Sequence, residues 1–450
     1  MKFRFVFFSL ASAAIAGSLV AIFYAWQPSI APIVSEGPFD SALVRKGAQL
    51  ALLGDCVTCH TADGGAAYAG GLAMPTPFGT IYSTNITPDP DTGIGHWSEQ
   101  AFVRALRAGV DREGRHLYPA FPYDHFTLVS NEDARALYAF FMSRDPVKAA
   151  ARPNELPFPI NIRLVLAGWK LLFLRQDRFV PDPARDAKWN RGKYLVDGLG
   201  HCGACHSPRN LMGAEEKSRG FAGGEAEGWH AYALGASSHA AVPWDEASLA
   251  EYLANGFHAM HGVAKGPMAN VLDNLAQVDR ADVDSMAHYL ASLADRRSEA
   301  PVEVAPNARA AAPSGPGKMP QAAGAQAATP AVAGDAGAAI YAAACASCHE
   351  SARPLPLGGA ALSRSSALTG ESPTNLVNVV MQGLPAADGT ARPIMPGFAD
   401  VLSDSQLIDL VHFVRERFSG KQDWTDVATA IRAARSTREF ARRSTANNAR

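Results

Sequence analysis

Three short segments of the sequence share one pattern, in which two cysteines separated by two residues are followed at once by a histidine. They read CVTCH at 56–60, CGACH at 202–206 and CASCH at 345–349. This is the attachment pattern of c-type haem. Two thiols one helical turn apart can form thioethers with the two vinyl groups of a porphyrin, and the adjacent histidine then binds the iron. The sequence therefore predicts three covalently bound haem c groups.

The attachment segments use all 6 cysteines of the chain. The predicted thioether residues are Cys56, Cys59, Cys202, Cys205, Cys345 and Cys348, and the predicted proximal iron ligands are His60, His206 and His349. A zinc ribbon would need two cysteine pairs close together, but successive pairs begin 146 and 143 residues apart. A thioredoxin-like site would need a βαβ pattern, which the sequence lacks. Disulfides within the pairs would leave the three histidines unexplained.

The opposite face of each iron takes a sixth ligand. Methionine is the common choice, and it raises the reduction potential relative to a second histidine. Met268, in GPMANVL, follows His206 by 62 residues, and Met395, in RPIMPGF, follows His349 by 46. These methionines are the predicted sixth ligands of the second and third haems. Met381 is nearer to His349 but falls in a helical pattern, where a core position is expected.

The matching position for the first haem is Phe121, 61 residues after His60, and phenylalanine cannot bind iron. His125 lies in the same stretch, LYPAFPYDHF, and is the predicted replacement. It would give bis-histidine ligation and a lower potential than at the other two haems. The alternatives are an open sixth position or a different side chain, namely Met74, His96 or His116.

Each attachment segment is expected to follow one helix, and a second helix is expected to close each module. The first set is predicted at 41–56, 190–202 and 334–345, and the closing set at 131–144, 280–293 and 404–418. Two closing helices begin with capping signals, Ser130 with Asp133 and Ser403 with Gln406. We therefore predict a mainly α fold of three tandem cytochrome c domains, at 40–150, 186–298 and 334–420.

The N-terminus predicts a membrane anchor. Lys2 and Arg4 precede an uncharged run from Phe5 to Trp26, which as a helix would span about 33 Å. The basic flank on the N-terminal side predicts that the rest of the chain is translocated. We interpret residues 1–28 as a signal anchor, a transmembrane helix behind which the domains face the periplasm from the inner membrane. Cleavage after the small-residue site at 14–16 is the alternative.

The remaining segments are connectors. Residues 151–185 form an apolar connector containing ELPFPINIRLVLAGWKLLFL, which is too short and too charged for a second span. It either packs between the first two domains or contacts a membrane surface or partner. Residues 299–333 are rich in Ala, Pro and Gly and predict a flexible linker, and 421–450 form a basic tail. The net charge of -2 provides no global basic field for nucleic acid.

Several long stretches resemble the three-haem cytochrome c subunits of bacterial membrane-bound dehydrogenases, such as the alcohol and gluconate enzymes. The alcohol dehydrogenase members carry methionine at the position of Phe121. The form PAFPY-x-H-F is more similar to the cytochromes of molybdenum hydroxylases of the nicotinate and aldehyde type. GPMANVL and MPGF extend the resemblance into the second and third modules, and its main stretches lie at 68–98, 104–126, 156–173 and 200–214.

The resemblance implies an electron-transfer subunit rather than an enzyme in its own right. Such subunits take electrons from a catalytic dehydrogenase, here a molybdenum hydroxylase, flavoprotein or quinoprotein, and pass them to ubiquinone or a terminal oxidase. The sequence shows no nucleophile–base pair, phosphate loop or dinucleotide fingerprint, so substrate oxidation is assigned to the partner. Two alternatives stay open: a self-contained haem enzyme of the peroxidase or thiosulfate dehydrogenase type with an open first haem, and a cytochrome c subunit of a terminal oxidase.

Overall fold

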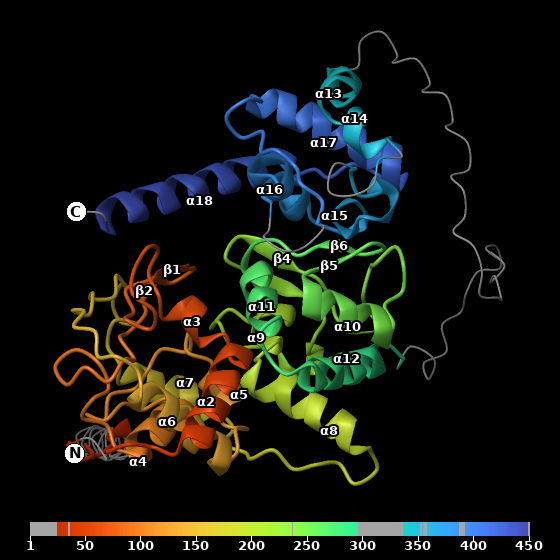
Figure 1. The fold of residues 1–450 in the computed structure, drawn as a ribbon. Helices are drawn as coiled ribbons and strands as arrows, with labels where there is room; N and C mark the ends of the chain where they lie inside the picture. The colour runs from red at the N-terminus through yellow and green to blue at the C-terminus, as the bar shows by residue number, and fades with distance from the viewer. Residues whose placement is uncertain are drawn as a thin grey trace, which may run out of the picture. The chain divides into compact units, whose positions relative to one another are not determined.

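The computed structural model describes residues 25–34, 37–235, 237–295, 336–351, 353, 358–386 and 392–448 (Figure 1). Most of the predicted anchor and the whole linker at 299–333 lie outside these residues. Among the helices that are described, none has the length and apolarity needed to cross a bilayer. The chain divides into two compact units. One contains Met1–Gly220, Asn270–Tyr289 and Arg442–Arg450, and the other contains Phe221–Ala269 and Leu290–Ala441.

The fold is mainly helical, as predicted. The helices up to residue 220 are α2 (Ser41–Leu53), α3 (Cys56–Cys59), α4 (Glu99–Ala108), α5 (Tyr123–Phe126), α6 (Asn131–Met142), α7 (Val165–Phe173), α8 (Ala187–Lys193), the π-helical η1 (Tyr194–Leu199), α9 (Gly203–His206) and the 3-10 helix η2 (Lys217–Arg219). The later helices are α10 (Glu246–Asn255), α11 (Pro267–Leu275), α12 (Arg280–Asp295), α13 (Ala336–Ala344), α14 (Ala346–His349), η4 (Leu362–Arg364), α15 (Ser366–Thr369), α16 (Thr374–Gln382), α17 (Asp404–Ser419) and α18 (Val427–Asn448).

The strands among the described residues form three short antiparallel hairpins. They pair β1 (Ala73–Thr76) with β2 (Gly79–Tyr82), β3 (Gly224–Ala226) with β4 (Trp229–Ala231), and β5 (Phe257–His258) with β6 (Gly262–Val263). Met74 is opposite Ile81 in the first hairpin. The hairpins are too short to form a sheet core, so the helices supply the packing.

A glycine in the helix before each attachment segment touches the backbone of the helix that closes the module. A Cβ atom added to Gly47 of α2 would lie 2.0 Å from the carbonyl oxygen of Ala136 in α6. The corresponding distances are 1.9 Å between Gly192 of α8 and Ser285 of α12, and 2.2 Å between Gly337 of α13 and Asp409 of α17. The same close crossing therefore occurs three times. Any residue larger than glycine at these positions would push the two helices apart.

The predicted capping signals form at the closing helices, in two different ways. At α17, Ser403 and Gln406 complete a reciprocal capping box. At α6, the Ser130 hydroxyl accepts from the Asp133 amide at 3.1 Å, but the Asp133 carboxylate turns away to accept from the Tyr194 hydroxyl at 2.6 Å. Tyr194 begins η1, so this bond joins the first module to the helix before the second attachment segment.

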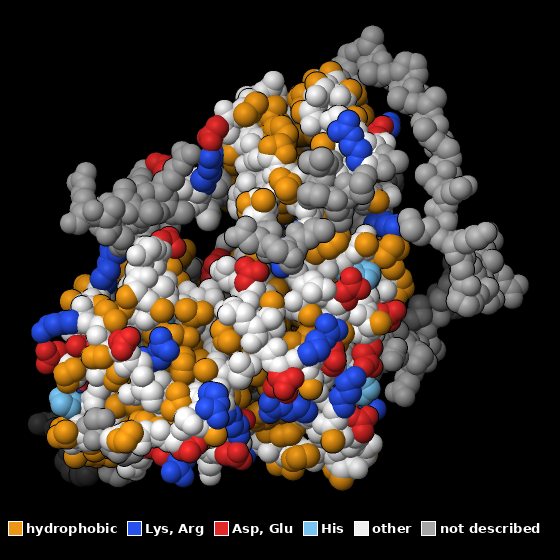
Figure 2. Space-filling model, in the orientation of Figure 1, with side chains coloured by type: hydrophobic (Ala, Val, Ile, Leu, Met, Phe, Trp, Pro, Cys, Tyr) orange, Lys and Arg blue, Asp and Glu red, His pale blue; other side chains and the backbone are white. Residues whose placement is uncertain are grey.

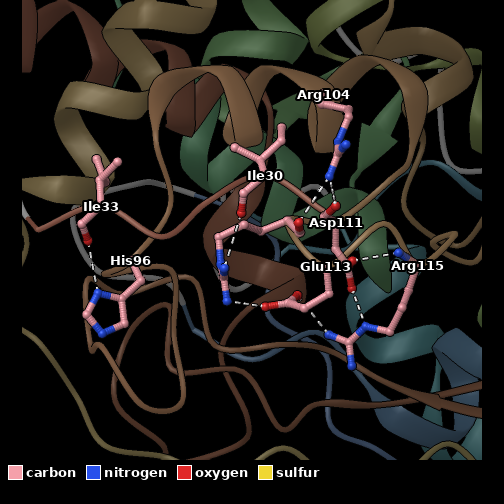
Figure 3. A network of polar contacts seen from close by, with 8 residues as sticks. Ile30, Ile33, His96, Arg104, Asp111, Glu113 and Arg115 are labelled. Carbon is pink, nitrogen blue, oxygen red and sulfur yellow. Dashed lines mark hydrogen bonds and ion pairs between the residues drawn. The ribbon is translucent and has the colours of Figure 1, made fainter. Parts of the chain in front are cut away.

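The stretch before α2 is bound to the surface of the first module (Figure 3). The Ile30 amide donates to the carbonyl oxygen of Arg112 at 2.8 Å, and His96 Nδ1 lies 3.0 Å from Ile33 O. Closer to the N-terminus, His116 Nε2 lies 2.7 Å from Ala25 O and is itself buried. The chain therefore meets this module at Ala25, beside His116.

The connector packs into the same unit through one face of α7. Leu166, Ala167 and Trp169 are buried, and the Trp169 indole donates to the carbonyl oxygen of Met212 at 3.0 Å. Lys170 is buried as well, and its ammonium donates to carbonyls at the end of α4. Packing by the connector is thus confirmed, and its outer face stays exposed.

The surface carries charges of both signs. On the face drawn in Figure 2, Lys and Arg side chains alternate with Asp and Glu among hydrophobic side chains. This mixture agrees with the net charge of -2. That face therefore carries no extended field of one sign that would attract a charged partner over a long distance.

We predict that Gly47→Ala destabilises the protein by about 2–4 kcal/mol, because the methyl group would have to displace the Ala136 carbonyl. Gly168→Ala is the matched control, since Gly168 lies inside α7 with open space where a Cβ would go. That change should be neutral or stabilise by up to about 1 kcal/mol. Urea unfolding of both variants checks this, and equal effects would contradict the close crossing.

Candidate haem attachment sites

The three CxxCH segments adopt the same local structure, a single helical turn. In each, the histidine amide donates to the carbonyl of the first cysteine, at 3.0 Å for His60, 2.9 Å for His206 and 3.0 Å for His349. This turn brings the two cysteines and the histidine to neighbouring positions. It is the arrangement that two thioethers and one axial ligand on a single porphyrin require.

The cysteine thiols sit in apolar surroundings. Burial raises the pKa of Cys56 and of Cys202 to about 12, and it also raises the pKa of Cys345. These groups are therefore neutral thiols at pH 7. A zinc site or a reactive redox pair needs thiolates in an electropositive setting, so the surroundings fit covalent attachment better than either alternative.

Two of the proximal histidines are oriented by backbone carbonyls. His60 Nδ1 lies 2.7 Å from Thr84 O, and His349 Nδ1 lies 3.0 Å from Ala360 O. A carbonyl only accepts, so Nδ1 carries the proton and Nε2 keeps its lone pair. Burial lowers the pKa of His60, although its bond to Thr84 acts in the opposite sense. The neutral ring is the form that binds iron.

A glycine leaves room for the third histidine. A Cβ on Gly359 would lie 2.7 Å from His349 Nδ1, so the backbone lies directly against the ring. His206 ends α9 and is half-buried. All six cysteines and all three histidines of the predicted set therefore lie in three equivalent segments.

The residues just before the first two attachment segments touch each other. His201 Nε2 lies 3.3 Å from Gly54 O, and a Cβ on Gly54 would lie 3.2 Å from the Leu199 side chain. Gly54 is two residues before Cys56, and His201 is next to Cys202. Asn274 of α11 also donates to Asp55 at the start of the first segment. The contact brings the starts of the two segments together within one unit.

His125 lies at the second attachment segment. Its Nδ1 is 2.8 Å from Asp197 O, and its Nε2 is 2.9 Å from the carboxylate of Glu215. A Cβ on Gly203 would lie 3.1 Å from the His125 ring. Iron ligation by His125 would require at least one of its polar contacts to be given up. Its assignment to the first haem stays a prediction, and these contacts weigh against it.

The His125–Glu215 pair is buried. Burial works to lower the pKa of His125, but the bond to Glu215 and the charge of Asp124 outweigh it and raise that pKa. Burial works to raise the pKa of Glu215, but His125 and Lys217 hold it at about 2. Such a pair costs much desolvation and depends on close geometry, so it fixes α5 against the segment that follows Cys205.

The other candidate ligands of the first iron lie on different elements and make different contacts. His116 is buried with contacts on both ring nitrogens, to Ala25 O and to the Lys170 ammonium at 3.0 Å. His96 contacts Ile33 O through Nδ1. Met74 is half-buried in β1, on the hairpin that leads to Thr84. Phe121 packs with Trp169 and Tyr123 in an apolar cluster.

The two predicted methionine ligands lie on different elements. Met268 is the second residue of α11 rather than part of a loop, and it is half-buried. Met395 exchanges backbone hydrogen bonds with Leu384 at 2.8 and 2.9 Å, and its side chain packs at the edge of the core of the third module. Met381 lies inside that core, as expected. The ligand roles of Met268 and Met395 stay predictions.

Comparison with known proteins decides the family. Residues 44–145 match the family described as cytochrome c, and residues 332–414 match the one described as cytochrome c oxidase, cbb3-type, subunit III. The gluconate 2-dehydrogenase cytochrome c subunit of Pantoea cypripedii is 37% identical over 404 residues, covering 85% of this chain and 87% of that protein. The chain belongs to the family of cytochrome c subunits of bacterial dehydrogenases.

Two further relatives are similar in sequence to this cytochrome c subunit. The cytochrome c subunit of the quinone alcohol dehydrogenase of Gluconacetobacter polyoxogenes is 37% identical over 420 residues, which are 88% of this chain and 85% of that protein. A nicotinate dehydrogenase subunit of Pseudomonas putida is 44% identical over 429 residues, or 92% of this chain. The chain spans only 34% of that relative's length.

Covalent haem c follows from these domains, and the described residues fit it. Half-buried cysteines, a one-turn helix and, at His60 and His349, a ring held through Nδ1 are what the attached group needs from the protein. Sequence reasoning does not identify the carbonyls of Thr84 and Ala360, nor the contact between Gly54 and His201. One signal in the sequence does point to the helix crossings: a glycine stands 8 to 10 residues before the first cysteine of each pair.

We predict that His125→Gln lowers the free energy of unfolding by about 2 kcal/mol, because Glu215 loses its buried partner and keeps only Lys217. The loss should be greatest below pH 6.5 and should shrink as the pH rises through the raised pKa of His125, because a proton bound more tightly by the folded state stabilises it only at low pH. Thermal unfolding at pH 6 and pH 9 measures both effects.

The matched control is His230→Gln, because His230 pairs with the largely exposed Glu225 and should contribute at most about 0.5 kcal/mol. The low-spin absorption of the haems should not change in His230→Gln. A change confined to one haem in His125→Gln would support His125 as an iron ligand, and an unchanged spectrum would exclude it.

Proposed function

We propose that this cytochrome c subunit carries three haems and transfers electrons from a catalytic dehydrogenase to ubiquinone or a terminal oxidase. The observation that carries the proposal is the contact between Gly54 and His201, which lie just before the first two attachment segments. Each haem, when bound, supplies an iron that holds or releases one electron. Adjacent attachment turns let an electron pass from one group to the next without a mobile carrier.

The protein's own contribution is to hold and tune the groups. The carbonyls of Thr84 and Ala360 fix the rings of His60 and His349. Burial around Cys56 and Cys202 raises the pKa of both thiols. Axial ligand type and burial are two main means by which a protein sets haem potential. The count of three is supported by three equivalent attachment turns and by three glycine crossings.

The partner is the catalytic subunit that oxidises the substrate. A molybdenum hydroxylase is favoured over a quinoprotein alcohol dehydrogenase, because identity is 44% to the nicotinate dehydrogenase subunit and 37% to the alcohol dehydrogenase subunit. Phe121, at the position where the alcohol dehydrogenase cytochromes carry methionine, points the same way. We place the subunit on the periplasmic side of the inner membrane, on the basis of the uncharged run from Phe5 to Trp26.

A terminal oxidase subunit is the less favoured alternative. The match to the cbb3-type subunit covers residues 332–414 alone. The dehydrogenase subunits match over 404 to 429 residues. The similarity to the oxidase subunit is thus confined to the third module, which a shared domain type accounts for.

Replacing one cysteine pair should remove one haem. We expect the purified chain to contain three haems by the pyridine haemochrome assay, and the double variant Cys345→Ser, Cys348→Ser to contain two. The same pair of changes at Cys56 and Cys59 should also leave two. A content that stays at three in either variant would refute attachment at that segment.

Electron transfer is tested with the catalytic partner present. The membrane complex should be purified through a tag on this chain, and the neighbouring reading frames identify the expected dehydrogenase. Adding that enzyme's substrate under anaerobic conditions should reduce at least two of the three haems, and a ubiquinone analogue should reoxidise them. Copurification with a copper–haem oxidase and no dehydrogenase would contradict the proposal. A high-spin first haem that turns over substrate alone would also contradict it.

A further inference from the structure

The outer face of α7 is unusual for a surface helix. Its buried face is formed by Leu166, Ala167, Trp169 and Lys170. Apolar residues also occupy the other face and the position just before the helix: Leu164 is 46% exposed, Val165 46%, Leu171 64% and Leu172 65%. A helix that is apolar on all sides is normally covered on all sides.

The one charged side chain within this helix, Lys170, is buried rather than exposed on the outer face. Lys170 is buried and donates to Ala108 O at 2.8 Å and to Gly109 O. Burial lowers its pKa to about 7, a cost that an exposed lysine would not have. From residue 164 to 174 the outward surface therefore carries no charge, and the nearest basic residues, Arg163 and Arg175, stand at its two ends.

Exposed apolar residues extend this surface on both sides of the helix. Phe158 is 79% exposed and Ile162 is 44% exposed, just before α7. Leu211 is 99% exposed and Met212 is 50% exposed, and the Met212 backbone is bonded to Trp169 of α7. We call α7 together with these four residues the α7 surface. A group of exposed apolar side chains of this kind marks an interaction site.

The N-terminal apolar run ends beside the α7 surface. Ala25 O lies 2.7 Å from His116 Nε2, and His116 Nδ1 lies 3.0 Å from the Lys170 ammonium. Arg163, just before α7, donates to His116 O at 2.9 Å. His116 thus links the end of the apolar run to α7 and to Arg163. Trp26, the next residue of the chain, is 62% exposed.

We propose that the α7 surface rests on the lipid bilayer, in the boundary between headgroups and acyl chains, next to the point where the N-terminal segment enters the membrane. Apolar side chains on one face, flanking arginines and an exposed tryptophan are the features of a helix lying in that boundary. The proposal rests on the membrane location proposed above. It adds a second, independent contact that holds the unit containing the first module in a fixed orientation to the membrane.

Lipid contact is tested by placing a fluorescent label on the full-length holoprotein. Leu172→Cys is labelled with a thiol-reactive NBD dye after confirming an unchanged haem spectrum. The protein is then reconstituted into phosphatidylethanolamine–phosphatidylglycerol vesicles with or without brominated acyl chains. Arg135→Cys on α6 is the control, because the Arg135 side chain is 66% exposed. We expect brominated lipid to reduce the fluorescence at 172 about twofold or more and to leave 135 unchanged.

Two results would overturn the proposal while leaving the membrane anchor intact. The first is a label at 172 that is neither quenched nor blue-shifted in vesicles that retain the protein. The second is a blue-shifted but unquenched label, which would mean that protein covers the α7 surface: the N-terminal segment, a second copy or the dehydrogenase. Failure of the protein to associate with vesicles at all would overturn both this proposal and the membrane location.

Discussion

The structure depends on one contact made three times, the approach of a helix to a carbonyl of a second helix through a glycine. Gly47, Gly192 and Gly337 each lie where a methyl group would fall within 2.2 Å of a carbonyl oxygen. Because each glycine comes shortly before a CxxCH segment, the crossing sets the position of the attachment turn. Because protein interiors are closely packed, a side chain at any of these three glycine positions could be accommodated only by moving a helix.

The three attachment turns have different surroundings. The first two belong to one unit, and the residues before them are joined by polar contacts of Gly54 with His201 and of Asp55 with Asn274. The third stands on its own core, built largely from α13, α15, α16 and α17. The same local turn therefore occurs in two segments of one unit and in a third segment of the other unit.

Much of this could be predicted from the sequence, because the chemistry of covalent haem attachment ties residue type to spacing. The six cysteines, the three histidines and the six helices around them follow from local pattern alone. The surroundings of His125 could not be predicted. Its buried partner, Glu215, lies ninety residues after it in the chain, and the spacing between His60 and His125 carries no information about that contact. Spacing from His206 likewise does not reveal that Met268 lies in α11, a helix that begins at Pro267.

Contacts between distant segments account for most of what spacing alone does not predict. The connector sequence is compatible with packing or with a membrane surface, and α7 packs with one face while its other face stays apolar and exposed. That division depends on Lys170 reaching the end of α4, which periodicity cannot reveal. The N-terminal stretch likewise binds through backbone carbonyls, which leave no trace in side-chain patterns.

Electron paramagnetic resonance of the oxidised protein tests the central proposal, that the first two haems lie close together. Two low-spin ferric irons in that arrangement should broaden each other's signals by dipolar coupling. Replacing Cys202 and Cys205 by serine should remove the second haem and sharpen the signal of the first. Signals of the first two haems that are already narrow in the intact protein, and unchanged in the variant, would contradict the account.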